Sequence, residues 1–176
     1  EIIVHYLDTG KHSLAKKAVK LGLEQHPSSV DLKLLDVEIL IFDNKLEKAT
    51  QKLRRIQLLA PANEEVYIHK ATILSKNGNH KKAIKNLEIA VLHASDKVDI
   101  WSMMGMEYLY LDDFEKARQN FVKCIDVDHE DYSSLYNVVY CFDMQKHHEK
   151  AVVFLNAFLD RSPYSEVAWH QLGRQY

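Results

Sequence analysis

Histidine, cysteine and carboxylate side chains are the groups in this sequence that could bind a metal or perform catalysis. The chain has ten histidines, and its densest cluster is His147, His148 and Glu149. Adjacent residues of a helix point in different directions, so these three side chains make a poor metal site. The motifs of phosphate-binding loops, dinucleotide sites, zinc proteases and serine hydrolases are missing. The sequence therefore predicts no metal, no cofactor and no enzymatic activity.

The two cysteines and the paired carboxylates fit structural roles. Cys124 and Cys141 form no C-x-x-C motif, and free cysteines are often buried, so both are expected to be buried thiols. Asp112 and Asp113 fall between two helical patterns, where carboxylates cap free N–H groups and complement the helix dipole. The cysteine content leaves the cellular compartment open, with the cytoplasm slightly favoured.

The composition is that of a folded helical protein. Of 176 residues, 47% are hydrophobic and 27% are charged, and only five glycines and three prolines occur. Sparse glycine and proline disfavour a turn-rich β protein. The net charge of −2 comes with no basic run, which argues against a nucleic-acid partner. No apolar run approaches the ~18 residues that span a bilayer, so direct membrane insertion is not expected.

An alanine recurs throughout the chain at one fixed period. This period fixes where the predicted helices lie, and the polar side chains discussed above are carried by these helices and their turns. Each alanine begins the buried face of a predicted helix. Self-similarity at one period of 20–50 residues is the signature of a repeat architecture. The alanines, each 34 residues after the last, are Ala15, Ala49, Ala83, Ala117 and Ala151.

Residues 98–131 carry the clearest copy of the repeated pattern. One helical face combines Trp101, Met104, Gly105 and Tyr108, at the spacing i, i+3, i+4 and i+7. Small residues allow two helices to approach, and large residues fill the space beside them. The second helical face follows after the two aspartates and consists of Phe114, Ala117, Phe121 and Cys124.

These residues resemble the tetratricopeptide repeat (TPR), and the resemblance covers essentially the whole chain. It implies an all-α fold, a right-handed TPR solenoid of stacked antiparallel helix pairs, with about five 34-residue repeats and the start of a sixth. We expect a single TPR domain over residues 1–176, as a fragment of a longer chain. The expected repeats are 1–29 (partial), 30–63, 64–97, 98–131, 132–165 and 166–176 (partial).

Several positions depart from the family pattern. Lys33 stands where the first helix of a repeat usually has a large aromatic residue. Histidines occupy the position of Phe114 in three other repeats, and we expect half-buried rings that pack against the turn. These histidines are His12, His80 and His148.

In TPR proteins the first helices of the repeats line a concave groove that usually holds the ligand, so the resemblance implies a partner-binding groove here. Helical register assigns sixteen residues to it. They are Asp31, Leu34, Glu38 and Phe42; Glu65, Ile68, His69 and Thr72; Asp99, Ser102, Met103, Met106 and Tyr110; and Tyr136, Asn137 and Tyr140.

The groove chemistry predicts a protein or peptide partner with apolar anchors and some basic residues. Acidic residues stand at equivalent positions, and Met, Tyr and Leu lie beside them. The family's clamp for acidic chaperone tails needs Lys and Arg where this chain has Asp99 and Met103, so that ligand is not expected. We therefore predict a non-catalytic protein–protein interaction scaffold.

Three alternatives stay open at this point. The groove side chains could serve only to pack against a neighbouring repeat or a helix of the same chain. The chain could be a regulatory or sensory segment of a larger multidomain protein. Finally, exposed repeat ends could mediate self-assembly into a homo-oligomer.

Overall fold

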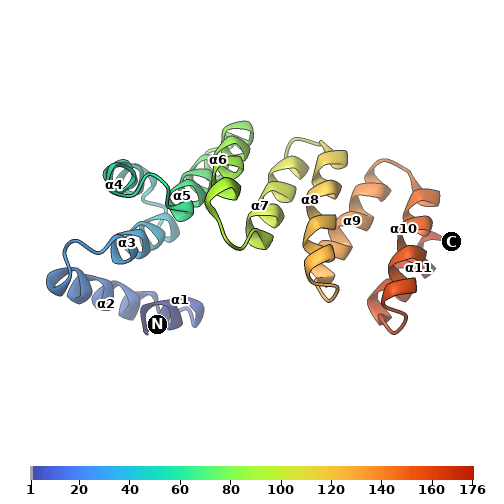
Figure 1. Cartoon of the computed structure of the whole chain (residues 1–176), viewed down its shortest axis with the longest axis horizontal. Coiled ribbons are helices and arrows are strands. Elements are labelled where there is room, and N and C mark those ends of the chain that lie inside the picture. The colour runs from blue at the N-terminus through green and yellow to red at the C-terminus, as the bar shows by residue number, and fades with distance from the viewer. Residues whose placement is uncertain (1) are drawn as a thin grey trace. The chain divides into compact units, whose positions relative to one another are not determined.

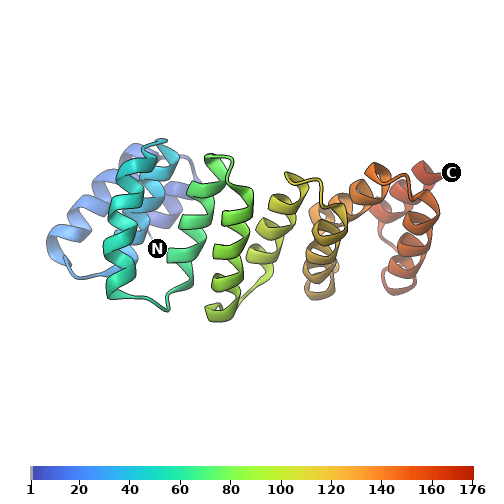
Figure 2. The ribbon, with the colours of Figure 1, turned by 90° about the horizontal axis from the view of Figure 1, so that it is seen from above.

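The computed structural model describes residues 2–176, and every regular element in that range is an α-helix. Figures 1 and 2 show these helices from two directions. The eleven helices are α1 (Ile2–Asp8), α2 (His12–Gln25), α3 (Val30–Phe42), α4 (Leu46–Leu59), α5 (Glu64–Lys76), α6 (His80–His93), α7 (Val98–Leu109), α8 (Phe114–Val127), α9 (Tyr132–Met144), α10 (His148–Arg161) and α11 (Glu166–Gln175).

The helices follow the period of the sequence. From α2 onward, the even-numbered helices begin 34 residues apart, and so do the odd-numbered helices from α3 onward. All five periodic alanines are fully buried, at 0% exposure. The predicted all-α architecture of stacked helix pairs is therefore confirmed.

The turn inside each helix pair has one residue in the left-handed region of backbone space. In the first three turns this residue is Gly10, Asn44 or Gly78, types that adopt a positive φ at low cost. In the last two turns it is Asp112 or Lys146, with φ of 56° and 57°. The backbone geometry of the turn is thus the same in all five helix pairs, while the residue type at the left-handed position differs.

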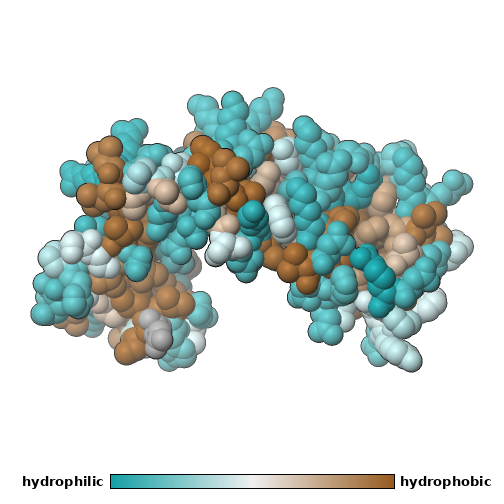
Figure 3. Space-filling model, viewed as in Figure 1, coloured by the Kyte–Doolittle hydropathy of each residue, from teal (hydrophilic) through white to brown (hydrophobic). Residues whose placement is uncertain are grey.

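The chain divides into two compact units, one up to Ala94 and one from Ser95 to Tyr176. In the first unit, each helix packs against the next, and α3 also contacts α5. Its largest buried cluster is aliphatic, with Leu34 and Leu53 among its members, and a smaller cluster joins residues of α2 to α3. Hydrophobic residues also reach the surface of this unit among hydrophilic ones, as the space-filling view shows (Figure 3).

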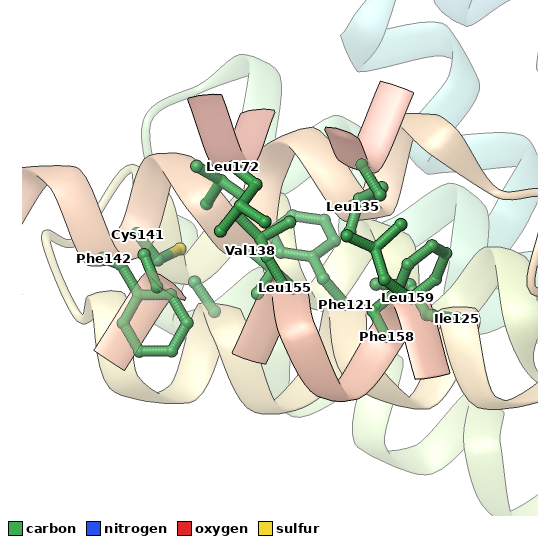
Figure 4. Packing of buried hydrophobic residues seen from close by; sticks show 14 residues of the cluster. Phe121, Ile125, Leu135, Val138, Cys141, Phe142, Leu155, Phe158, Leu159 and Leu172 are labelled. Atoms are coloured by element: carbon green, nitrogen blue, oxygen red, sulfur yellow. The ribbon is translucent and has the colours of Figure 1, made fainter. Parts of the chain in front are cut away.

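The second unit has a larger buried cluster, and this cluster contains aromatic rings. Its helices pack in sequence from α7 to α11, and α9 also contacts α11. Phe121 and Phe158 are both at most 1% exposed, and Phe142 lies at the edge of the same cluster. Figure 4 shows these rings among Ile125 of α8 and the leucines and valines of α9, α10 and α11.

In the pair formed by α7 and α8, a small residue and a large residue fit together, as the sequence predicts. A Cβ atom on Gly105 would lie 2.6 Å from Cζ of Phe121, which is closer than two carbons can approach. Gly105 therefore leaves the room that the Phe121 ring occupies. At Gly173, the corresponding position of α11, a Cβ atom would meet nothing within 4 Å.

Candidate functional site

In the first unit, carboxylates from three helices lie near one another. The predicted groove residues Asp31 and Glu38 lie on α3 and Glu65 on α5, and Asp8 joins them from α1; all four are exposed. Partial burial raises the pKa of Glu38, and the charges of Glu65 and Asp8 raise it further. We call Asp8, Asp31, Glu38 and Glu65 the acidic face.

The carboxylates of the acidic face repel one another electrostatically. Partial burial raises the pKa of Glu65, and the neighbouring charges of Glu64 and Asp31 add to that effect. A raised carboxyl pKa means that the ionised form is disfavoured at this place. A positively charged group brought to this surface would relieve that repulsion.

The other predicted residues of the first unit differ in how far solvent can reach them. Phe42 is exposed, and its ring stacks on His12 at 3.6 Å between centroids. Ile68, His69 and Thr72 are half-buried. Leu34 is only 1% exposed and belongs to the aliphatic core, so its assignment to the groove is wrong.

The environment of His69 disfavours the charged form of its ring. Burial lowers its pKa to about 4, because removing the ring from water disfavours the charged imidazolium. The ring is therefore neutral at pH 7 and adds no positive charge to the acidic face. Beside it, the Thr72 hydroxyl donates to the carbonyl of Ile68 at 3.0 Å and so does not depend on a ligand for its hydrogen bond.

In the second unit, four of the predicted groove residues are exposed aromatic or thioether side chains. Met106 and Tyr110 at the end of α7 are exposed, and so are Tyr136 and Tyr140 on α9. We call these four residues the aromatic face. Of the other predicted residues, Asp99 is exposed at the start of α7, and Ser102, Met103 and Asn137 are half-buried.

The Tyr140 ring is held by a residue of another helix. Phe114, the first residue of α8, meets it edge to face with centroids 6.4 Å apart. Such a contact is a favourable geometry for two rings and restricts how Tyr140 can turn. The orientation of one ring of the aromatic face is therefore restricted by packing within the chain.

Equivalent positions on the helices at either end of the series were missing from the predicted site. Val4 and Asp8 on α1, and His170 and Arg174 on α11, are all exposed. Counting one 34-residue period from Glu38, Phe42, Tyr136 and Tyr140 would have found all four. Arg174 of α11 is a positively charged residue. The predicted groove residues of α7 and α9 in the same unit include no lysine or arginine.

Comparison with known proteins identifies the repeat. The tetratricopeptide repeat model matches residues 64–91 and 98–131. The chain contains tetratricopeptide repeats. The sequence matches no curated protein.

Solved structures extend the TPR fold over nearly the whole chain. MamA from Desulfovibrio magneticus RS-1 has a TM-score of 0.71 at 17% identity, over 94% of this chain and 93% of that one. YrrB, described as a TPR protein with an unusual peptide-binding site, has a TM-score of 0.68 at 16% identity, over 90% and 82%. A chain of an APC/C hetero-tetramer has a TM-score of 0.76 at 16% identity, over 98% of this chain but 35% of its own length.

The TPR fold is typical of non-catalytic repeat scaffolds, and the repeats support a protein-interaction scaffold in general terms. Within residues 2–176, no group of three or more His, Cys, Asp or Glu side chains is placed to hold a metal ion. In the same range no helix is long and apolar enough to cross a membrane.

The isolated histidines and cysteines of the repeats serve mostly as packing groups. His12 and His80 are half-buried as expected, whereas His148 is exposed, so that prediction is wrong for one of the three. The His148 Nδ1 instead lies 3.0 Å from the side-chain oxygen of Gln175. Both cysteines are free and buried, and burial raises the pKa of Cys141 to about 11. Neither thiol has the depressed pKa of a nucleophile.

Proposed function

We propose that this chain is a non-catalytic scaffold that binds a peptide or helix of a partner protein in a concave groove lined by the first helices of its repeats. The observation that carries the proposal is the composition of that surface. Carboxylates gather on α1, α3 and α5 of the first unit, and aromatic and thioether side chains gather on α7 and α9 of the second.

Each face favours a different feature of the partner. The acidic face favours Lys or Arg side chains, because a cation there offsets the repulsion between Glu38 and Glu65. The aromatic face favours apolar anchors, since tyrosine offers a large contact area at low conformational cost and methionine adapts to irregular shapes. A partner with apolar anchors and basic residues would match both.

The binding energy would come from surfaces that are already folded. Helix-borne side chains lose little further freedom when a ligand binds, which lowers the entropic cost of association. Tyrosines that become buried on binding often contribute a large share of the binding energy at protein interfaces. The contribution of the acidic face should fall as salt is added, because exposed charges are screened within about 10 Å at 0.1 M salt.

A selection from a random peptide display library tests the proposal and does not require the partner to be identified in advance. The parent protein is the bait, and selected peptides are then measured against three folded variants. Glu38→Lys with Glu65→Lys reverses the acidic face, and Tyr136→Ala with Tyr140→Ala truncates the aromatic face. Glu88→Lys, on an exposed position of α6, is a single charge-reversal control outside both faces.

We expect enrichment of peptides that combine Lys or Arg with aromatic or aliphatic residues. Such peptides should lose at least tenfold in affinity on one of the two face variants and keep it on the Glu88→Lys control. Peptides that bind all three variants equally well would contradict the groove assignment. Light scattering over a range of protein concentrations tests self-assembly separately, because an oligomer changes mass with concentration.

A further inference from the structure

One position of the repeat carries an aromatic ring in three repeats and a lysine in a fourth. The fourth residue of the first helix is Tyr67 in α5, Trp101 in α7 and Trp169 in α11, but Lys33 in α3. The Tyr67 hydroxyl donates to the carbonyl of Pro61 at 2.8 Å. The Trp169 indole N–H makes the same bond to Pro163 at 2.9 Å.

Residues of the following second helix cover these rings. His93 of α6 stacks on Tyr67 with centroids 6.0 Å apart. The Lys123 ammonium of α8 lies 5.7 Å from the centroid of Trp101. In α5 and α7 the ring therefore packs on the second helix of its own pair, and in α5 and α11 it is hydrogen-bonded to a proline carbonyl of the preceding turn.

In the repeat of residues 30–63, the corresponding space is an open cavity of about 450 Å³. Its apolar wall consists of Leu23, Pro27, Ile56 and Leu59. Pro27 stands one 34-residue period before Pro61, and Leu59 one period before His93. The walls that enclose a ring in the next repeat are thus present here, while the chain provides no ring of its own.

Charged side chains line the rest of this cavity, and most of them are positive. Lys33, Lys52 and Arg55 line it together with a single carboxylate, Asp36. Asp36 is ion-paired with Lys52. Lys33 and Arg55 form no ion pair within the described residues 2–176, so their charges remain available.

We propose that this cavity binds an aromatic side chain of a partner peptide that carries carboxylates on either side of the ring. Its volume lies within the range of ligand pockets, roughly 300–1,000 Å³. The ring packs on Leu23, Ile56 and Leu59 and against the guanidinium plane of Arg55. The flanking carboxylates form charge-assisted hydrogen bonds with Lys33 and Arg55.

The surface beside the cavity carries charges of both signs. A neighbouring depression of about 340 Å³ shares Leu23, Asp36 and Lys52 with the cavity and adds Lys16, Lys20 and Glu24. Because Lys16 is ion-paired with Asp43, this depression offers little free positive charge, and the proposal depends on the cavity itself. The cavity shares no residue with the acidic or aromatic face, and the proposal does not rest on groove binding.

Fluorescence anisotropy with a short dye-labelled peptide, one tryptophan between two pairs of aspartates, tests this proposal. Two control peptides replace the tryptophan with alanine or the aspartates with asparagine. The decisive variant is Lys33→Tyr, which fills the cavity with the chain's own ring, as Tyr67 does one repeat later. Arg55→Glu reverses one wall charge, and Lys85→Glu makes the same change at an exposed site of α6 outside the cavity.

We expect the parent and the Lys85→Glu variant to bind the tryptophan–aspartate peptide alike. Lys33→Tyr and Arg55→Glu should each weaken binding at least tenfold, and each control peptide should bind at least tenfold more weakly than the first. In methyl NMR, the peptide should shift the signals of Ile56 and Leu59. Absence of binding by the parent, equal binding of the alanine peptide, or unchanged binding by a folded Lys33→Tyr variant would overturn the proposal.

Discussion

The two units have the same helix period and turn geometry but different interiors and surfaces. The first unit is aliphatic inside, has an acidic first-helix face, and contains the open cavity beside Lys33. The second is packed around phenylalanines and presents tyrosines and methionine on its first-helix face. The same repeat backbone is thus compatible with two different sets of core side chains and two different kinds of surface.

The packing inside the helix pairs explains how one backbone serves both interiors. Gly105, the eighth residue of α7, faces Phe121, the eighth residue of α8. Ala71 and Leu87 stand at the same positions of α5 and α6 in the first unit, and both large residues, Phe121 and Leu87, are fully buried. A smaller residue on one helix is matched by a larger one on the other, which keeps the density of the core constant.

The largest effect is expected from truncating the aromatic core. Phe121→Ala should lower the free energy of unfolding by about 3–5 kcal/mol, because it removes a fully buried ring and leaves a cavity. Leu53→Ala, at the same repeat position in the first unit, removes a smaller side chain and should cost less. Urea denaturation of both variants measures the difference. Equal losses would show that the aromatic core is no tighter than the aliphatic one.

A double-mutant cycle can convert the second unit's helix pair into the first unit's pattern. Gly105→Ala should cost about 1–3 kcal/mol, since its Cβ atom meets the Phe121 ring at 2.6 Å. Phe121→Leu should cost a similar amount by leaving a gap. The double variant reproduces the Ala71 and Leu87 pairing, so it should be more stable than the sum of the two losses predicts.

The control for this cycle is Gly173→Ala, which has open space around its Cβ position and should stabilise the helix by up to about 1 kcal/mol. Strictly additive losses in the double-mutant cycle, read from urea midpoints, would contradict direct contact between Gly105 and Phe121.

The first unit should respond to acid through His69. Its folded pKa of about 4 lies below the ordinary value of 6.5, so the unfolded chain takes up a proton first as the pH falls. The stability that His69 contributes above pH 6.5 is therefore lost as the pH falls towards 4, by at most about 3 kcal/mol at 1.36 kcal/mol per pKa unit. The raised pKa values of Glu38 and Glu65 act in the opposite direction, favouring the folded state as they protonate.

Comparison of the parent with His69→Phe isolates the histidine from these carboxylates. The variant should gain stability relative to the parent between pH 6.5 and 4 in chemical denaturation at each pH. A constant difference over that range would show that His69 does not titrate differently in the folded and unfolded states.

The smallest effect is expected at the turns. Lys146 has a φ of 57°, where Gly78 has 71° at the same repeat position. Lys146→Gly should raise the free energy of unfolding by about 0.5–1 kcal/mol, because relief of left-handed strain outweighs the added freedom of the unfolded chain. Gly78→Lys is the reverse change and should lower it. Thermal melts that move the same way for both variants would contradict this account.

Much of the fold could be predicted because it depends on local periodicity. The 34-residue spacing of alanines places every helix pair, and the left-handed turn residues recur at that same spacing. The candidate site was harder to predict. A helical register gives the direction of each side chain but does not show which other helices pack over it. Leu34 is therefore predicted to lie in the groove, although it is buried in the core.

The sequence by itself determined the repeat, the helix pairs, the buried alanines and the composition of the first-helix faces, because all of these follow from spacing along one chain. Only the tertiary structure decided which carboxylates of different helices repel one another electrostatically, and that burial keeps His69 neutral. It also decided that an open cavity lined by basic residues lies beside Lys33. These properties depend on distances between helices and on exclusion of water. Residue spacing along the chain does not contain that information.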